Sequence, residues 1–233
     1  VTEIADGSID FENVSFRYNK EAQHRALKEV NLHIPAGATV GILGGTGSSK
    51  STLVQLIPRL YDVSEGVLKV GGVDVRNYDL EVLRDNVAMV LQKNVLFSGS
   101  IKDNLRWGNP DATDEELIEA CKLAQAHDFV QSFPDGYDTK IEQGGTNVSG
   151  GQKQRLSIAR AICKNPDIYV FDDSFSALDM KTDAKLRESL HPIIQDMVVM
   201  IVAQRVSTIK NADHIIVLDS GKVVGKGRHQ ELL

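Results

Sequence analysis

One stretch constrains the fold more than any other: an apolar strand that runs into glycines and then directly into a helix. In "ATVGILGGTGSSKSTLVQLIPRL", residues 38–60, the strand-like run ends at Leu43. Helical spacing follows at Leu53, Leu56, Ile57 and Leu60. A strand joined to a helix by a glycine-rich turn is typical of a β-α unit. Strand-like and helical segments keep alternating further along the chain, which predicts an α/β fold with a central, mostly parallel sheet.

The rest of the chain predicts the other elements of this fold. Alternating apolar residues in "SIDFENVSFRY" and "LKEVNLHI" predict strands, with an irregularity near Asn13. "GVLKVGGVDV" is typical of a hairpin, and "VAMVLQ" predicts a strand that ends at Gln92. From about Ser98 to Lys164 the pattern is mostly helical, and Thr113, with a glutamate three residues later, has the spacing of a capping box. Single strands are predicted in "PDIYVFDD", "MVVMIVAQ" and "HIIVLDSGKVV", with a helix over residues 181–195.

Composition narrows the class of protein. Apolar residues make up 42% and charged residues 25% of 233 residues, as in ordinary globular domains. A formal net charge of −6 gives no reason to expect a nucleic-acid partner. Cys121 and Cys163 lack a metal or redox spacing, so we expect buried free thiols in a reducing compartment.

Membrane and targeting signals are not visible in the sequence. The longest apolar run, "MVVMIVA", is far shorter than the roughly 18–20 residues that span a bilayer. We see no secretory signal, and because the first residue is Val1, we expect the sequence to be a piece of a longer chain.

The glycine-rich turn has the composition of a phosphate-binding loop, with one departure. The usual pattern is G-x-x-x-x-G-K-[S/T], and Ser49 stands where the pattern has its second glycine. In such a turn backbone N–H groups converge on one spot, and the helix N-terminus adds partial positive charge. Lys50 is expected to reach the outer phosphates and Ser51 to ligate Mg²⁺. The Cβ of Ser49 restricts its backbone, and a plain flexible turn is the alternative interpretation.

Two carboxylates follow a buried strand about 120 residues after this loop. "IYVFDD" places Asp172 and Asp173 at the C-terminal end of the strand. A carboxylate delivered to that edge of a sheet suits an Mg²⁺ ion beside phosphates, so we expect Asp172 to hold the metal through water. Asp173 stands where a base that polarises the attacking water would lie. A cap for the next helix is the alternative reading of such a pair.

A third motif makes the chain resemble one family. "NVSGGQKQR", residues 147–155, resembles the signature sequence of ATP-binding cassette (ABC) ATPases, usually written L-S-G-G-Q. A valine replaces the leucine, and the matching residues are Ser149, Gly150, Gly151 and Gln152. The order of phosphate loop, Gln92, signature and Asp172 extends the resemblance over essentially all 233 residues. "LFSGSIKDNL", "FPDGYDT" and "EQGGTN" resemble exporter cassettes with fused membrane domains rather than importer subunits.

The resemblance implies a fold and a domain plan. The fold is a P-loop NTPase core with a central mostly parallel sheet, an N-terminal antiparallel β subdomain and an inserted α-helical subdomain. Residues 1–233 would form one ABC ATPase domain. Residues 1–97 and 165–233 would form the core with its β subdomain, and residues 98–164 the helical subdomain that carries the signature.

The resemblance also implies roles for single residues. Tyr18 is similar to the aromatic residue that stacks on adenine, a strand-end aromatic being the alternative, and Gln92 to the glutamine that joins the Mg²⁺ and water shell. The expected ATP-binding set is Tyr18, Gly44, Gly45, Thr46, Gly47, Ser48, Ser49, Lys50, Ser51 and Thr52. The expected metal ligands are Ser51, Gln92 and Asp172. The loop expected to cross a dimer interface is Ser176, Ala177, Leu178 and Asp179.

Two departures from the family pattern concern the residues that complete hydrolysis. The family ends its carboxylate strand with Asp-Glu, whereas this chain has Asp173 in the second place. Aspartate is one methylene shorter, and a misplacement of about 1 Å can cost on the order of 10²-fold in rate. Exporter cassettes also carry a histidine that contacts the γ-phosphate where this chain has Gln204, a neutral amide that cannot shuttle a proton. We expect His214 and His229 to be surface or capping residues that do not replace it.

These departures lead to a hypothesis about partners. Family members pair two cassettes head to tail, so that the phosphate loop of one faces the signature of the other. We expect this chain to be one half of a heterodimeric exporter, with fused transmembrane domains and a second, different cassette as partners, at the cytoplasmic face of the cell membrane. Its Lys50, Gln92, Asp173 and Gln204 would form a slow site that holds MgATP, while its signature would complete the partner's site.

Three alternatives remain open at the level of the sequence. The first is a fully active homodimeric exporter cassette in which Asp173 works as the base. The second is a non-transport ABC ATPase, such as a ribosome-associated or DNA-repair protein, although those carry paired cassettes or coiled-coil insertions. The third is a regulatory ATP-binding module without turnover.

Overall fold

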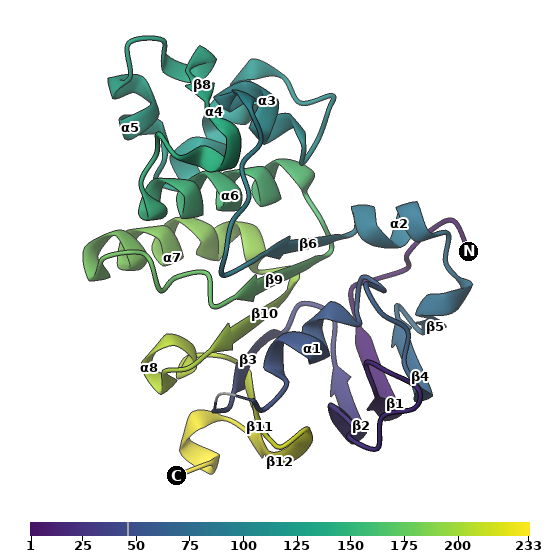
Figure 1. Ribbon diagram of the computed structural model, residues 1–233. Coiled ribbons are helices and arrows are strands. Elements are labelled where there is room, and N and C mark those ends of the chain that lie inside the picture. Colours follow the sequence, from purple (N-terminus) through teal and green to yellow (C-terminus); the bar gives the residue numbers. More distant parts are fainter. Residues whose placement is uncertain (46) are drawn as a thin grey trace. The chain divides into compact units, whose positions relative to one another are not determined.

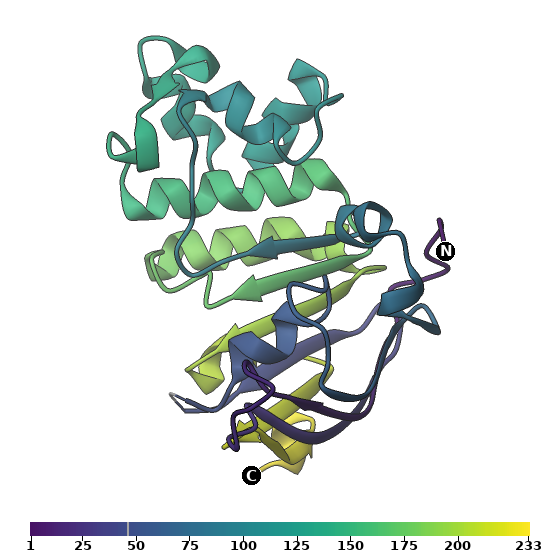
Figure 2. The same cartoon turned by 45° about the vertical axis from the view of Figure 1, so that its right-hand side comes forward.

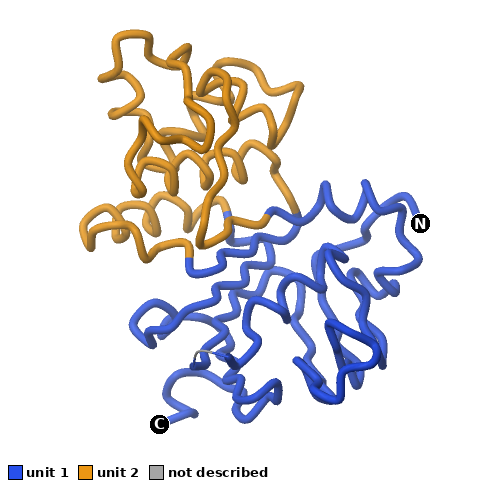
Figure 3. The backbone as a smooth tube through the Cα atoms, in the orientation of Figure 1, with its two compact units in different colours: residues 1–88, 167–173, 194–233 blue, residues 89–166, 174–193 orange. Residues whose placement is uncertain are grey.

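The computed structural model describes residues 1–45 and 47–233, which divide into two compact units (Figure 3). Unit 1 contains residues 1–88, 167–173 and 194–233, and unit 2 contains residues 89–166 and 174–193. Sheets with parallel and antiparallel strands combine with helices, so the predicted α/β fold is confirmed (Figure 1). Among the described residues, none of the helices is long and apolar enough to cross a bilayer.

The larger sheet has six strands in the order β12-β11-β3-β10-β9-β6. Their bounds are β3 (Thr39–Leu43), β6 (Val87–Val90), β9 (Ile168–Asp172), β10 (Val198–Ala203), β11 (His214–Asp219) and β12 (Lys222–Gly227). β10 pairs in parallel with both β3 and β9, and β3 pairs in parallel with β11. Parallel sheets are covered on both faces, which explains why every residue of β9 is buried. The C-terminal ends of β3, β9 and β10 therefore meet at one edge, where the candidate loop and carboxylates emerge.

Two sequence predictions for this sheet were wrong in their bounds. The single strand predicted over residues 214–224 is a hairpin of β11 and β12, because Ser220 (φ 50°) and Gly221 (φ 80°) reverse the chain. The strand predicted to end at Gln92 is β6, which ends two residues earlier at Val90.

A second sheet in unit 1 is antiparallel and has the order β2-β1-β4-β5. Its strands are β1 (Ile9–Phe16), β2 (Leu27–Ile34), β4 (Glu65–Val70) and β5 (Val73–Asp74). The irregularity predicted near Asn13 is confirmed: its φ is 49°, and the register with β2 shifts between Phe11 and Val14. Such a bulge lets the strand bend without losing the alternation that buries one face.

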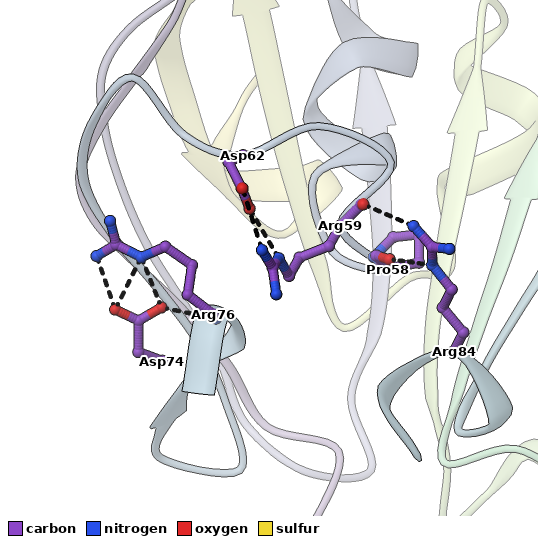
Figure 4. Close-up of polar contacts among 6 residues, drawn as sticks. All are labelled: Pro58, Arg59, Asp62, Asp74, Arg76 and Arg84. Atoms are coloured by element: carbon purple, nitrogen blue, oxygen red, sulfur yellow. Dashed lines mark hydrogen bonds and ion pairs between the residues drawn. The ribbon is translucent and has the colours of Figure 1, made fainter. Parts of the chain in front are cut away.

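The helices of unit 1 are short: α1 (Lys50–Gln55), α2 (Leu80–Asp85) and α8 (Val206–Ile209). α1 packs against β10, as both views show (Figures 1 and 2). The periodicity that continues to Leu60 overstates its length, because the chain turns after Gln55 and Arg59 has a φ of 55°. Arg84 of α2 donates to the carbonyl oxygens of Pro58 and Arg59 at 3.0 and 2.9 Å (Figure 4). These bonds give partners to two carbonyl groups of the turn that follows α1.

Residues 98–164, which belong to unit 2, are mostly helical, as the sequence predicts. Unit 2 contains α3 (Ile101–Arg106), α4 (Asp114–Leu123), α5 (His127–Ser132), α6 (Gly150–Lys164) and α7 (Met180–Ile194), with a small antiparallel pair, β7 (Gly99–Ser100) and β8 (Lys140–Ile141), that the sequence did not predict. The Oγ1 of Thr113 accepts a hydrogen bond from the N–H of Glu116 at 3.2 Å, which starts α4 at the predicted place.

The interior of unit 2 includes an apolar face of α4. Leu117, Cys121 and Ala124 are fully buried, and α4 packs against α6. Both cysteines are free thiols, Cys121 buried and Cys163 half-buried. Burial raises the pKa of the Cys163 thiol to about 11, which keeps it protonated at neutral pH.

Candidate functional site

The loop between β3 and α1 leaves one side of its backbone open. Among the described residues, and apart from each glycine's chain neighbours, no atom lies within 4 Å of the place where a Cβ on Gly45 or Gly47 would be, and Gly47 has a φ of 80° that favours glycine. Gly44 has a different task, since a Cβ there would lie 2.5 Å from the carbonyl oxygen of Leu218. Thr46, a predicted member of this loop, lies outside the described residues. The open side of the loop suits a ligand that approaches the backbone closely.

Polar groups of this loop match an anionic ligand. The Nζ of Lys50 donates to the carbonyl oxygen of Gly44, and to that of Gly45 at 3.1 Å. The Oγ of Ser48 is buried and has no hydrogen-bond partner among the described residues. A folded-back ammonium group and an unpaired buried hydroxyl are both groups that phosphate oxygens satisfy.

The loop meets the carboxylate of β9 through Ser51. The Ser51 Oγ donates to Asp172 Oδ1 at 3.2 Å, and Asp172 is 8% exposed. The pKa of Asp172 is raised, and burial of the carboxylate is the largest cause. The hydrogen bond from Ser51 and the charge of Lys50 lower the pKa, whereas the charge of Asp173 raises it further. A hydroxyl and a carboxylate are hard oxygen donors of the kind that hold Mg²⁺ next to phosphates, so these two residues fit the predicted ion. The structure thus brings together three predicted site residues: Lys50, Ser51 and Asp172.

Asp173 and Gln204 follow the ends of neighbouring strands. β9 and β10 are parallel with Asp172 opposite Val202, and the N–H of Asp173 donates to the Val202 carbonyl oxygen at 3.0 Å. Burial raises the pKa of Asp173, while Lys50 and Arg205 lower it. A raised pKa makes a carboxylate a better proton acceptor. Gln204 comes directly after β10 and is exposed.

Ser49 has a strained backbone, which the sequence alone could only suggest. It precedes α1 with φ 71° and ψ 28°, in the left-handed region, and its side chain makes no capping bond to the helix. A side chain other than glycine costs roughly 1–2 kcal/mol in that region. The glycine of the usual pattern is therefore the residue that this backbone favours.

We expect Ser49→Gly to stabilise the chain by about 1 kcal/mol. Relief of the left-handed strain exceeds the roughly 0.4–1 kcal/mol that a glycine costs through the freer unfolded chain. Thermal unfolding without nucleotide should show a midpoint about 2–4 °C higher. Ser49→Ala keeps the Cβ and is the control; a gain as large as that of Ser49→Gly would contradict the strain explanation.

Tyr18 is held beside α1 with its ring largely in solvent. It is 59% exposed, and its hydroxyl group hydrogen-bonds the Thr52 Oγ1 at 2.5 Å. Its ring makes edge contacts with Phe16 at 4.8 Å and with Tyr61 at 5.3 Å between centroids. An exposed, anchored aromatic ring suits the predicted stacking on a base. The sequence gives one signal for Tyr61, an aromatic residue directly after the apolar residues 53–60, and no role was predicted for it.

The signature-like segment of unit 2 forms the start of α6. The Ser149 Oγ accepts from the Gln152 N–H at 3.1 Å, and the Gln152 Oε1 accepts from the Ser149 N–H at 3.0 Å. This capping box orders a long helix whose first N–H groups carry partial positive charge. A Cβ on Gly151 would lie 3.4 Å from the carbonyl oxygen of Ala177, so the predicted interface loop passes beside the signature.

The remaining predicted residues also belong to unit 2. Asp179, in the predicted interface loop with Ser176 and Leu178, accepts from the N–H and Oγ1 of Thr182 at 2.7 and 3.0 Å, which lowers the pKa of Asp179. Gln92 is exposed in the segment after β6. Gly150, the first residue of α6, has open space around it.

Comparisons with known proteins agree on one family. Residues 27–176 match the sequence pattern of the family described as "ABC transporter". The chain is 46% identical over 227 residues to "Putative multidrug export ATP-binding/permease protein YgaD" of Bacillus subtilis, covering 97% of this chain and 39% of that protein. It is 45% identical over 231 residues to a Staphylococcus aureus protein under the same description, covering 99% of this chain and 40% of the relative.

A solved structure supports the same assignment. The structure titled "Structure of a bacterial Atm1-family ABC exporter with ATP bound" matches with a TM-score of 0.95 and 35% identity. The match covers 99% of this chain and 40% of the other. The chain therefore spans about two fifths of the length of the relatives that it resembles.

Proposed function

Because this chain belongs to the ABC transporter family, we propose that it is the nucleotide-binding domain of an ABC exporter. The observation that carries ATP binding is the group formed by the open glycine loop, the Lys50 ammonium and the Ser51–Asp172 hydrogen bond of 3.2 Å. The relatives are ATP-binding/permease proteins of which the chain spans 39–40%, which supports fused transmembrane domains outside this sequence. In that arrangement the chain works at the cytoplasmic face of the cell membrane.

Each residue of the site would have a defined task. The loop N–H groups and Lys50 bind and orient the phosphates, and Tyr18 stacks on the base. Ser51 and Asp172, with Gln92, would hold Mg²⁺, which supplies charge neutralisation at the phosphates. Asp173 accepts the proton of the attacking water at a carboxylate oxygen.

We further propose that turnover at this chain's own pocket is slow. Asp173 is one methylene shorter than the family's glutamate, and the Gln204 amide hydrogen-bonds without carrying a proton. The signature at the start of α6 would complete the pocket of a second, different cassette, and residues 98–164 would act as the helical subdomain that presents it. One pocket of the pair would then hold MgATP while the other hydrolyses it.

The function is tested by ATP binding to the full-length transporter. Lys50→Ala should weaken ATP binding about 10- to 100-fold, because a hydrogen bond to a charged group contributes roughly 1.5–3 kcal/mol. Binding of a fluorescent ATP analogue in detergent or lipid measures this. Lys222→Ala, an exposed lysine of β12, is the control and should bind normally. Unchanged binding in Lys50→Ala would contradict the proposal.

A further inference from the structure

Unit 2 buries two polar side chains next to the segment that carries Gln92. Gln154 is 2% exposed and Ser174 is fully buried. Gln154 lies on α6, five residues after the signature serine, and Ser174 directly follows the carboxylate pair 172–173. Neither side chain belongs to the ATP-binding residues proposed above. Buried polar groups of this kind are costly unless each finds a partner, so their contacts are informative.

The two side chains hold both flanks of Gln92. Asn94 lies two residues after Gln92, and its Nδ2 donates to the Gln154 Oε1. Val90 lies two residues before Gln92, and its carbonyl oxygen accepts from the Ser174 Oγ at 2.5 Å.

A further bond joins the two side chains themselves. The Gln154 Nε2 donates to the Ser174 carbonyl oxygen, so one connected network links three separate parts of unit 2.

The chemistry of this network requires an amide at position 154. A glutamine presents one donor and one acceptor on the same planar group, and both are used: the Nε2 toward a carbonyl oxygen and the Oε1 toward an amide. If the Gln154 amide were rotated by half a turn, its Oε1 would face the Ser174 carbonyl oxygen and its Nε2 would face the Asn94 Nδ2. The network therefore fixes one orientation, and it holds Asn94 and Ser174 in one arrangement.

We propose that Gln154 and Ser174 form a clamp that positions Gln92 and ties it to the signature helix. This role rests on the proposed ATPase function. Gln154 and Ser149 share the first turns of one rigid helix, so a shift of the signature against the partner's nucleotide moves Gln154 with it. Through Asn94 and the Ser174 backbone, that shift reaches the Gln92 segment, which lies in the same unit of the chain. Gln154 and Ser174 are positioning residues that couple Gln92 to the signature helix.

The test uses the full-length transporter purified with its partner subunit. Gln154→Met keeps the length of the side chain and removes both hydrogen bonds, and Asn94→Ala removes one of them. Both should lower the maximal ATP turnover on the order of 10-fold, the usual effect of losing a group that orients a site residue, and leave the KM for ATP unchanged. The double variant should be no slower than Gln154→Met, because both changes remove the same bond.

Hydrogen exchange supplies a readout that does not depend on ATP. In both variants the amides of residues 91–94 should exchange faster, while those of α4 stay protected. Gln131→Met, the same change at an exposed glutamine of unit 2, is the control and should alter neither readout. Normal turnover and normal exchange in both variants would overturn the clamp, as would weakened ATP binding with unchanged turnover. A wild-type transporter that neither binds nor hydrolyses ATP would instead overturn the proposed function, and the clamp's role with it.

Discussion

Replacing Gly150 by aspartate is expected to lower ATP turnover of the transporter on the order of 10²–10³-fold while this chain still binds ATP. In the proposed pair, the start of α6 faces the nucleotide held by the partner. A carboxylate at that place opposes the phosphates and cancels the partial positive charge of the helix N-terminus. The effect falls on the partner's pocket, since Lys50 and Asp172 of this chain are untouched.

The structure has room for a side chain at position 150. Apart from the neighbouring backbone of α6, no atom of the described residues lies within 4 Å of the place where a Cβ on Gly150 would be, so the larger residue fits. Gly150 is the first residue of α6, where an acidic side chain stabilises a helix. The Gly150→Asp variant should therefore unfold at a temperature no lower than that of the unmodified protein.

A neutral control separates charge from bulk. Gly150→Asn adds a side chain of the same size without the charge and should keep much more turnover than Gly150→Asp. ATP hydrolysis by the purified pair, with ATP binding to this chain measured in parallel, decides between them. Full activity of Gly150→Asp would refute the composite pocket, and equal losses in both variants would refute the charge explanation.

Restoring both family residues is expected to raise turnover at this chain's own pocket on the order of 10²-fold. Asp173→Glu extends the carboxylate by one methylene toward the attacking water. Gln204→His replaces a neutral amide by a side chain that can carry a proton near neutral pH. Because the two residues follow adjacent ends of β9 and β10, their effects should reinforce each other.

The measurement needs a transporter in which only this chain's own pocket hydrolyses ATP. The Gly150→Asp background silences the partner's pocket, so the remaining hydrolysis belongs to this chain. Asp173 has a φ of 50°, which aspartate tolerates better than glutamate, so turnover is compared per folded molecule. Full rates after either single change, or no gain from both together, would contradict the proposed division of work between the pockets.

Most strands of the fold could be predicted from the pattern of apolar residues along the chain. The strands β2, β3 and β9 lie where alternation or apolar runs predict them, because burial of one or both faces of a strand imposes a pattern on consecutive residues. The phosphate loop is equally local, since its glycines, its lysine and its hydroxyl residues are neighbours in the chain. Where elements end was less predictable: α1 stops at Gln55, although its apolar spacing continues.

Three features could thus be read from consecutive residues: the α/β class, the position of the glycine loop between strand and helix, and the pair Asp172–Asp173 at a strand end. The interactions between those residues depend on how the chain packs. Packing brought Ser51 to Asp172 across 121 residues and gave Ser49 a left-handed backbone. It also joined residues 60 and 84 positions apart in the clamp beside Gln92. The sequence does not show these hydrogen bonds, because the periodicity of apolar residues depends only on which side chains are buried. A hydrogen bond between distant residues forms only after the chain has packed.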